Sequence, residues 1–272
     1  MLKHGLLEGK KGIIFGALNE HSLAWAVASQ CAAEGAKIVL TNAPIALRWG
    51  PLQELADSIG APVIPADATR PEDLEFLFTE SMNKLGGKID FILHAVAMSQ
   101  NLRRGRSYED ISYNYFQQTL DISALSFHKL LQTAYKLDAV AEYGSIVALS
   151  YIASQRAFQG YNDMADAKAL LESIARNFGL IYGREKHVRI NTVSQSPTFT
   201  TAGGSINYFE RFYTIADHTS PLGNASAQDC ANICVMLFSD YTRKITMQTI
   251  YHDGGFSATG IQVSSDKPWN KE

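Results

Sequence analysis

The side chains best placed to do chemistry in this sequence are two tyrosines and a lysine. Tyr161 and Lys168 are seven residues apart. On an α-helix, which rises about 1.5 Å per residue, they lie on one face about two turns apart, so their polar tips can contact one elongated ligand. Tyr151 directly follows the apolar run 145–150, which is typical of a buried strand. Because open α/β sheets bind ligands beyond the carboxyl ends of their strands, we expect the three side chains to converge on one cleft. Taken singly, each is more often a packing residue or a solvated charge.

A turn near the amino terminus has the position of a phosphate-binding site. The segment 11–16 has the pattern of a buried strand and 22–34 that of a helix, so Gly16 to Ser22 form the turn between them. Backbone N–H groups at a helix start can bind a pyrophosphate, because their unpaired donors and the helix dipole both favour an anion. A complete Gly-x-Gly-x-x-Gly motif is absent, so the turn by itself does not identify a dinucleotide.

The end of the next predicted strand, 37–41, bears on the choice between NADH and NADPH. An acidic side chain there binds a ribose hydroxyl, whereas arginine or lysine accepts a 2′-phosphate. The residues that follow, Asn42 to Pro44, supply neither, and Arg48 is at least as well explained as a solvated surface residue. The sequence therefore favours NADH.

Seven short apolar segments alternate with helical patterns. They lie at 11–16, 37–41, 61–65, 88–94, 145–150, 188–193 and 246–252. Strands that alternate with helices indicate a parallel sheet. With 272 residues, of which 46% are apolar and 19% charged, the chain is long enough for one large domain. We predict an α/β fold, namely a single Rossmann-type, doubly wound domain over residues 1–272, with a mainly parallel seven-stranded sheet and helices on both faces.

Composition and charge argue against several classes of function. A net charge of -3 and the lack of an arginine-rich run argue against nucleic-acid binding. The amino terminus has no signal-peptide core and no apolar run approaches the roughly 20 residues that span a bilayer, so we expect a cytoplasmic protein without a membrane partner. Cys31, Cys230 and Cys234 have no metal spacing and are expected to be buried free thiols. The histidines are scattered, and no metal site is predicted.

The spacing around Tyr161 resembles that of one reductase family. Short-chain dehydrogenase/reductases carry a Tyr-x3-Lys pair, but Ala165 occupies that lysine position here and the lysine comes one helical turn later. Tyr-x6-Lys, with a second tyrosine ten residues upstream, resembles the enoyl-[acyl-carrier-protein] reductases of the FabI type. The resemblance covers nearly the whole chain and includes Leu149-Ser150-Tyr151, Tyr161-Asn162, Met164, Ala167-Lys168-Ala169 and Asp121-Ile122-Ser123. A carbonyl reductase of the same superfamily and a nucleotide-binding regulator without turnover are the alternatives.

The resemblance implies NADH-dependent reduction of the trans-2 double bond of enoyl thioesters on acyl carrier protein. It implies that Tyr161 donates a hydrogen bond to the thioester oxygen, that Lys168 binds the nicotinamide ribose, and that Tyr151 lines the acyl site. The implied cofactor-binding residues are Gly16, Leu18, Ser22, Leu23, Asn42, Asp67, Ala68, Ala95, Val96, Ala97, Ser150, Lys168, Pro197, Thr198 and Thr200. The implied substrate-binding residues are Tyr151, Tyr161, Phe199, Ala202 and Tyr208. Asp67 either accepts from the adenine amino group or caps the helix that follows it.

The segment 195–217 is expected to be a substrate-binding loop and lid. It combines glycine, proline and small hydroxyl residues with an aromatic stretch, a composition typical of mobile loops. In the family this loop usually begins Ser-Ala-Gly-Pro, so Gln195 and Ser196 are departures, whereas Pro197 and Thr200 match.

Two further expectations concern partners. The helices predicted within about 107–137 and 161–182 are apolar on more than one side, which requires a second burial partner. The family implies a homotetramer, and burial under loops of the same chain is the alternative. The carrier protein is acidic, and Arg211 is the one basic residue in the stretch 206–211, so we expect Arg211 to contribute to its docking.

Overall fold

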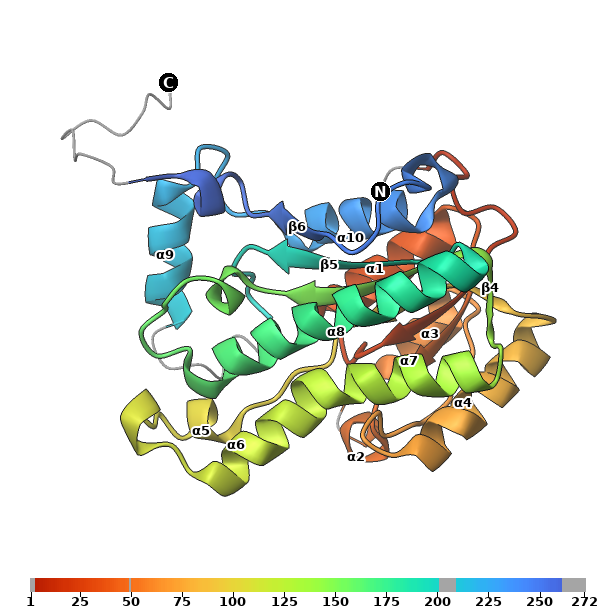
Figure 1. Cartoon of the computed structure of the whole chain (residues 1–272). Helices are drawn as coiled ribbons and strands as arrows, with labels where there is room; N and C mark the ends of the chain where they lie inside the picture. Colours follow the sequence, from red (N-terminus) through yellow and green to blue (C-terminus); the bar gives the residue numbers. More distant parts are fainter. Residues whose placement is uncertain (1–2, 49, 201–208, 261–272) are drawn as a thin grey trace.

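The computed structural model describes residues 3–48, 50–200 and 209–260, and these contain a six-stranded parallel sheet. The strands are β1 (Lys11–Phe15), β2 (Lys37–Thr41), β3 (Ile89–His94), β4 (Val140–Ser150), β5 (Arg189–Gln195) and β6 (Thr249–His252). Their order is β2-β1-β3-β4-β5-β6. β2 lies on one side of β1 and the later strands on the other, so the strand order reverses between β1 and β3. The carboxyl ends of the strands face the side on which α5 (Gln100–Arg103) and α9 (Phe209–Thr219) lie, at the left of Figure 1. The predicted α/β, Rossmann-type fold is confirmed.

The prediction of a seventh strand at 61–65 is wrong, because this described segment forms no named strand. A single bridge pairs Val63 with Leu40 of β2. The Leu40 N–H donates to the Pro62 carbonyl at 3.0 Å, and the Leu40 carbonyl accepts from Ile64 at 3.0 Å. The Ala66 N–H continues the contact by donating to the Asn42 carbonyl at 3.1 Å, beyond the end of β2. Pro62 has no N–H to donate, so the pairing cannot extend toward the start of β2.

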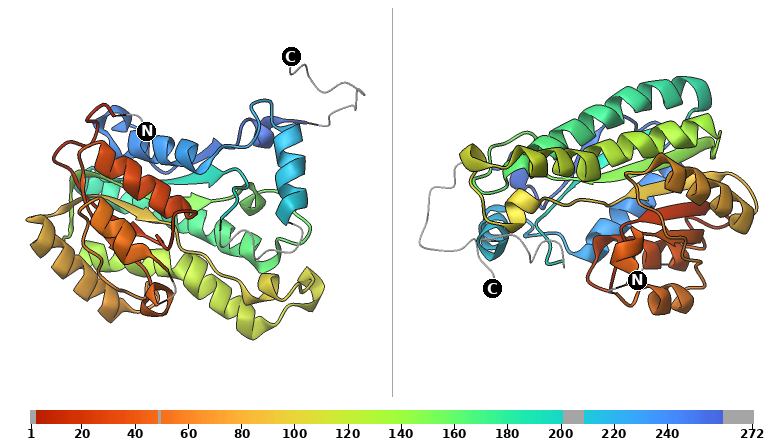
Figure 2. Two further views of the ribbon diagram at one scale, coloured as in Figure 1. Left: turned by 180° about the vertical axis from the view of Figure 1, so that it is seen from behind. Right: turned by 90° about the horizontal axis from the view of Figure 1, so that it is seen from below.

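Helices cover both faces of the sheet (Figures 1 and 2). One face is covered by α4 (Pro71–Leu85), α7 (Ser126–Lys136) and α8 (Asn162–Lys186), and the other by α1 (Leu23–Ala33), α3 (Leu52–Ser58) and α10 (Ala227–Phe238). Alternate strand residues enter the two cores, since Ile13 belongs to the first and Ile14 to the second. The remaining helical elements are α2 (Pro44–Leu47), α6 (Tyr113–Leu120), a π-helical turn (Asp121–Leu125) and 3-10 turns at Tyr108–Asp110, Ile152–Ser154, Asp240–Thr242 and Phe256–Ala258.

The predicted long helix within 107–137 is confirmed, with a turn that the sequence did not indicate. α6 continues through the π-helical turn directly into α7. Ser123 in this turn accepts a hydrogen bond from the Met98 N–H at 3.0 Å and donates one to the Met98 carbonyl at 3.2 Å. The π turn therefore fixes the chain that follows β3, and such turns are frequent at functional sites.

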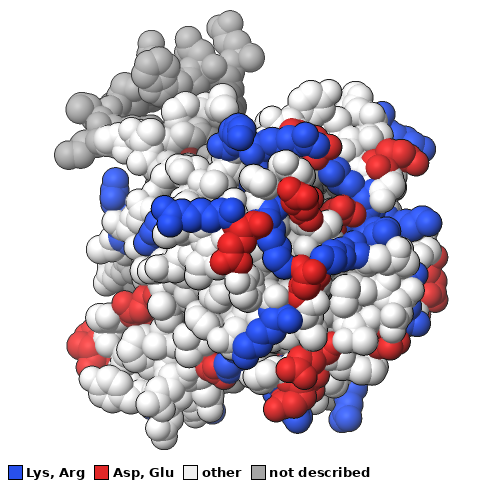
Figure 3. Space-filling model, turned by 45° about the vertical axis from the view of Figure 1, so that its right-hand side comes forward, with Lys and Arg blue, Asp and Glu red and all other residues white. Residues whose placement is uncertain are grey.

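The surface and the thiols agree with the composition. Cys31, Cys230 and Cys234 are buried free thiols, as predicted. The face in Figure 3 intersperses Lys and Arg with Asp and Glu. Among residues 3–48, 50–200 and 209–260, no helix is long and apolar enough to cross a membrane, and no cluster of three metal-ligating side chains occurs.

Candidate active site

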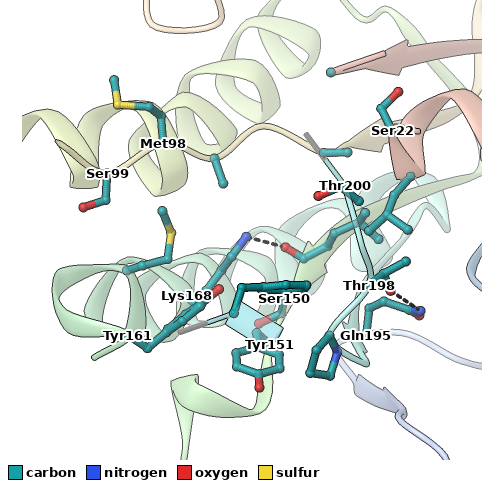
Figure 4. Close-up of a pocket in the computed structure, with 18 of the residues that line it drawn as sticks. Ser22, Met98, Ser99, Ser150, Tyr151, Tyr161, Lys168, Gln195, Thr198 and Thr200 are labelled. Carbon is teal, nitrogen blue, oxygen red and sulfur yellow. Dashed lines mark hydrogen bonds between the residues drawn. The ribbon is translucent and has the colours of Figure 1, made fainter. Parts of the chain in front are cut away.

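A cavity of about 270 Å³ opens at the carboxyl ends of four neighbouring strands. Gly16 follows β1, Ala95 follows β3, and Ser150 and Gln195 end β4 and β5; all four line the cavity. Figure 4 shows the side chains that converge there. The cavity lies at the reversal of strand order, where doubly wound sheets bind their ligands.

Tyr161 and Lys168 reach the cavity from the start of α8. Tyr161 immediately precedes this helix, and Lys168 lies two turns further on. Asn162 between them has φ +45°, which asparagine tolerates better than most residues, and its side-chain amide donates to the Arg106 carbonyl. In Figure 4 the Tyr161 hydroxyl and the Lys168 amine point into the same space. The pair lines one cavity, as predicted, although Tyr161 lies just before the helix and not within it.

Lys168 is held below the end of β4. Lys168 is only 7% exposed, and its Nζ donates a hydrogen bond to the Leu149 carbonyl at 2.7 Å. Burial lowers the pKa of Lys168 to about 8, while the negative charge of Glu172, one turn further along α8, acts to raise it. An ammonium group has three donors, so two remain for a ligand.

Tyr151 and Tyr161 pack against each other, with ring centroids 4.9 Å apart and planes at 49°. Burial raises the pKa of both phenols above the ordinary value, so both remain protonated donors at neutral pH. Neither hydroxyl makes a hydrogen bond to any residue that the structure describes. The Tyr151 hydroxyl points away from Lys168 in Figure 4, so Tyr161 is the phenol placed to act beside the lysine.

The turn between β1 and α1 fits a pyrophosphate. Gly16 has φ +96°, and a Cβ there would meet the Ala95 carbonyl oxygen at 2.2 Å, so only glycine allows this approach. Ser22 caps α1, its hydroxyl accepting from the N–H groups of Leu18 at 3.3 Å and Trp25 at 3.4 Å. The first turn of α1 lines the cavity, and helix-start N–H groups together with the helix dipole bind anions.

A second hollow, of about 300 Å³, lies beyond the end of β2 and fits the adenosine half of a dinucleotide. It is lined by Ala43, Pro44, Ile45, Arg48, Asp67, Arg70 and Asp73. Arg70 Nε lies 3.8 Å from an Asp73 carboxylate oxygen, which balances its charge. The Asp67 carboxylate accepts from the N–H and hydroxyl of Thr69 at 2.9 and 2.7 Å, and α4 has no side-chain cap. Of the two roles left open for Asp67, helix capping is therefore wrong.

The cavity contains most of the site residues that the sequence predicted. Gly16, Leu18, Ser22, Leu23, Ala95, Ala97, Ser150, Tyr151, Tyr161, Lys168, Pro197, Thr198 and Thr200 line it. Asn42, Asp67, Ala68, Val96 and Phe199 do not. Asn42 lies next to it, because its side-chain amide donates to the Ala17 carbonyl at 2.9 Å. Ala202 and Tyr208 lie outside the described residues.

One wall of the cavity was missed by the sequence reasoning. It consists of Met98, Ser99, Leu102 and Arg103, from the segment after β3 and from α5. Buried Asp163, two residues after Tyr161, accepts from the Ser99 hydroxyl at 2.7 Å and from the Asn101 amide at 2.8 Å. These partners are 64 and 62 positions from Asp163, so no local spacing could indicate the wall.

Gln195 and Ser196 also line the cavity, although the sequence marked them only as departures. The Gln195 amide donates to the Ala225 carbonyl at 3.2 Å, and its Oε1 pairs with Nδ1 of His252 at 2.8 Å. Burial lowers the pKa of His252, so the ring is neutral and Nδ1 carries the donated proton. The Ser196 hydroxyl accepts from the Ala225 N–H at 3.0 Å. The loop that begins here is thus anchored to the chain before α10.

The family model described as Enoyl-(Acyl carrier protein) reductase matches residues 16–257 of this chain. The chain belongs to this family. A relative from Rickettsia bellii, Enoyl-[acyl-carrier-protein] reductase [NADH] FabI, is 36% identical over 259 residues, which cover 94% of this chain and 97% of the relative. The crystal structure of a FabI-NADH complex from Alistipes finegoldii is similar at 60% identity and a TM-score of 0.94, covering 95% of this chain and 91% of that one. An enoyl-acyl carrier protein reductase from Bacillus cereus, solved with NADP+ and indole naphthyridinone, has 28% identity and a TM-score of 0.87, covering 94% and 99%. The family predicted from Tyr-x6-Lys is confirmed.

Proposed function

We propose that this chain uses NADH to reduce the trans-2 double bond of enoyl thioesters on acyl carrier protein, the final reductive step of type II fatty-acid elongation. The observation that carries the proposal is the pairing of Tyr161 and Lys168 in one cavity, at the strand reversal of a chain that belongs to the reductase family. A carbonyl reductase is disfavoured because Ala165 stands where that class has its lysine.

The residues of the cavity can stabilise the charge that this reaction creates. Bound NADH supplies the hydride. As the β-carbon is reduced, negative charge develops on the thioester oxygen, and Tyr161 donates a hydrogen bond to that oxygen. Because burial raises the pKa of its phenol, Tyr161 is a neutral donor and not a phenolate. A donor aimed at developing charge lowers the barrier more than it strengthens substrate binding.

Lys168 and Tyr151 have supporting roles in this proposal. The two remaining N–H donors of Lys168 hold the ribose hydroxyls beside the nicotinamide, and its charge contributes positive potential to the cavity. Tyr151 lines the acyl thioester site through its ring. Pro197, Thr198 and Thr200 form the part of the cavity that would face the nicotinamide carboxamide.

The decisive experiment measures NADH consumption by the purified chain with a crotonyl thioester. Turnover that needs the trans-2 double bond supports the proposal. Consumption with a β-ketoacyl thioester instead identifies a carbonyl reductase, and NADH binding without turnover of either substrate identifies a regulator.

We also propose that the chain assembles as a homotetramer in the cytoplasm. Support for assembly comes from apolar side chains exposed near or on the long helices, namely Leu125 at 38%, Leu180 at 46% and Ile181 at 42%. Support for the compartment comes from the three free thiols, which persist in reducing surroundings. Sedimentation equilibrium tests the assembly, and a monomer at micromolar concentration would contradict it.

The acidic carrier protein needs positive charge beside the entrance to the cavity. Arg211 is exposed on α9, the helix that contributes Phe209 and Phe212 to the cavity. Arg103 is a further basic residue that the fold brings to the cavity, at the end of α5. We propose that Arg211 steers the carrier and that Arg103 assists it.

A further inference from the structure

A buried carboxylate behind the cavity collects hydrogen bonds from both sides of Tyr151. Glu172 on α8 is 3% exposed. Its Oε1 accepts from the hydroxyls of Ser150 and Ser154, each at 2.6 Å, and its Oε2 accepts from the side-chain amide of Gln155 at 3.2 Å. The donors stand immediately before Tyr151 and three and four residues after it, so one carboxylate fixes the whole turn that carries this ring.

The same carboxylate is a near neighbour of Lys168. The two residues are four positions apart on α8, so their side chains lie on one face of the helix, one turn apart. Among the residues that the structure describes, Glu172 is the group whose charge favours the protonated form of Lys168 against burial. The Lys168 amine bonds to the carbonyl of Leu149, and Glu172 bonds to the neighbouring Ser150. The end of β4 is therefore held by the two side chains together.

The network extends to the edge of the sheet. The Tyr251 hydroxyl on β6 donates to the Gln155 Oε1 at 2.5 Å, and Gln155 in turn donates to Glu172. Packing alone does not require a charge at this position, because burying a carboxylate costs free energy that a neutral side chain avoids. The negative charge strengthens the three hydrogen bonds that Glu172 accepts, and it also favours the ionised form of Lys168 one turn away.

We infer that Glu172 is a positioning residue of the reductase, which holds the turn bearing Tyr151 against α8 and keeps Lys168 charged for binding the dinucleotide ribose. This rests on the proposed function of Lys168. Within residues 3–48, 50–200 and 209–260, the other titratable groups around Lys168 are His94 at the end of β3 and the phenols of Tyr151 and Tyr161. Burial lowers the pKa of His94 to about 3 and raises the pKa of both phenols, so all three are neutral near pH 8. Burial lowers the pKa of Lys168, and among the described residues Glu172 is the charge that opposes this shift.

The Glu172→Gln substitution removes the charge at nearly constant volume. It also sets an amide donor against the donating amide of Gln155, so Gln155 must turn over and donate to the Tyr251 hydroxyl instead of accepting from it. In the wild-type protein NADH affinity should fall as pH rises through about 8, when Lys168 becomes neutral. In the variant that loss should begin about one pH unit lower, because the favourable charge is gone. Near pH 8 the protonated fraction of Lys168 should then be about five-fold lower than in the wild type, so we expect a roughly five-fold weaker Kd there and less than a two-fold change at pH 7.

The test is a fluorescence titration of NADH across pH, which needs no turnover. Glu185→Gln is the matched control, since Glu185 is an exposed carboxylate on the same helix. It accepts a hydrogen bond from the Tyr135 hydroxyl at 2.5 Å. Glu172→Asp keeps the charge and should keep the wild-type pH midpoint, but its shorter side chain weakens the hold on Ser150, Ser154 and Gln155 and should lower kcat. Ser154→Ala keeps the charge and removes one donor, so it should lower kcat without moving the midpoint.

Two results would overturn the inference. One is a Glu172→Gln protein whose Tm falls while its pH midpoint for NADH is unchanged, because the carboxylate would then serve only stability. The other is an equal shift in Glu185→Gln. Failure of the proposed reaction is separate, since it would appear as absent turnover of the crotonyl thioester by the wild-type protein, whatever NADH binding shows.

Discussion

Replacing Tyr161 by phenylalanine tests the proposed chemistry with the least disturbance of the fold. The Tyr161 hydroxyl bonds to no residue that the structure describes, so the substitution breaks no internal hydrogen bond there, and the ring can keep its contact with Tyr151, 4.9 Å away. The free energy of unfolding should therefore change by less than about 0.5 kcal/mol. Removing one donor from a developing oxyanion costs about 3 kcal/mol, or on the order of 100-fold in kcat. The Kd for NADH should stay within about two-fold of the wild-type value, since the hydrogen bond forms with substrate.

The assay combines steady-state kinetics with crotonyl thioester, NADH binding by fluorescence, and thermal unfolding. Tyr182→Phe is the control, because Tyr182 is a buried phenol of the same helix whose hydroxyl donates to the Leu131 carbonyl at 3.0 Å. It should lose about 1 kcal/mol of stability and keep its kcat. A Tyr161→Phe enzyme with kcat within about three-fold of wild type would refute the assignment of Tyr161 as the donor. A parallel fall in stability and kcat would show that the hydroxyl supports the fold.

Three further outcomes are expected. Lys168→Ala should raise the Kd for NADH at least ten-fold, because a buried cation and two donors are lost; unchanged affinity would contradict the ribose role. NADH should exceed NADPH in kcat/KM, because Arg70 is paired with Asp73 in the adenosine hollow and Arg48 alone remains for a 2′-phosphate; an NADPH preference that disappears in Arg48→Ala would reverse this choice. Arg211→Glu should raise KM for the carrier-bound substrate several-fold at low salt, and less at high salt where exposed charges are screened, while the N-acetylcysteamine thioester is unaffected; equal effects on both substrates would mean that Arg211 supports α9 instead.

Local spacing was enough to predict the end of the cavity that contains Tyr161 and Lys168. Tyr161 and Lys168 line the same cavity because Tyr161 directly precedes α8 and Lys168 lies in its second turn. Gly16 was identified from its place between a strand and a helix, and its φ of +96° beside the Ala95 carbonyl explains why glycine stands there. The position of Tyr161 and Lys168 depends on residues close to them in the sequence. The position of Gly16 beside Ala95 follows from the pairing of β1 with β3 in the parallel sheet.

The missed features depend on contacts between distant segments. The predicted third strand is reduced to one bridge, and Pro62 limits it because a proline has no N–H to donate to β2. An apolar pattern does not register that missing donor. The wall around Ser99 depends on Asp163, which reads in the sequence as an ordinary polar residue of the first turn of a helix. Glu172 was overlooked for the same reason, since its donors come from the end of β4 and the turn after it, 17 to 22 positions away.

The departures from the family at 195 and 196 illustrate how the fold can accommodate a changed motif. In the usual Ser-Ala-Gly-Pro start the second residue has no side-chain hydrogen bond to offer. Here Gln195 joins the end of β5 to both His252 of β6 and the Ala225 carbonyl before α10. Ser196 adds a bond from the Ala225 N–H, so the backbone that enters Pro197 and Thr198 is fixed from two sides. The backbone freedom that a glycine would give at position 196 is replaced by side-chain anchoring, and Pro197, Thr198 and Thr200 still line the cavity.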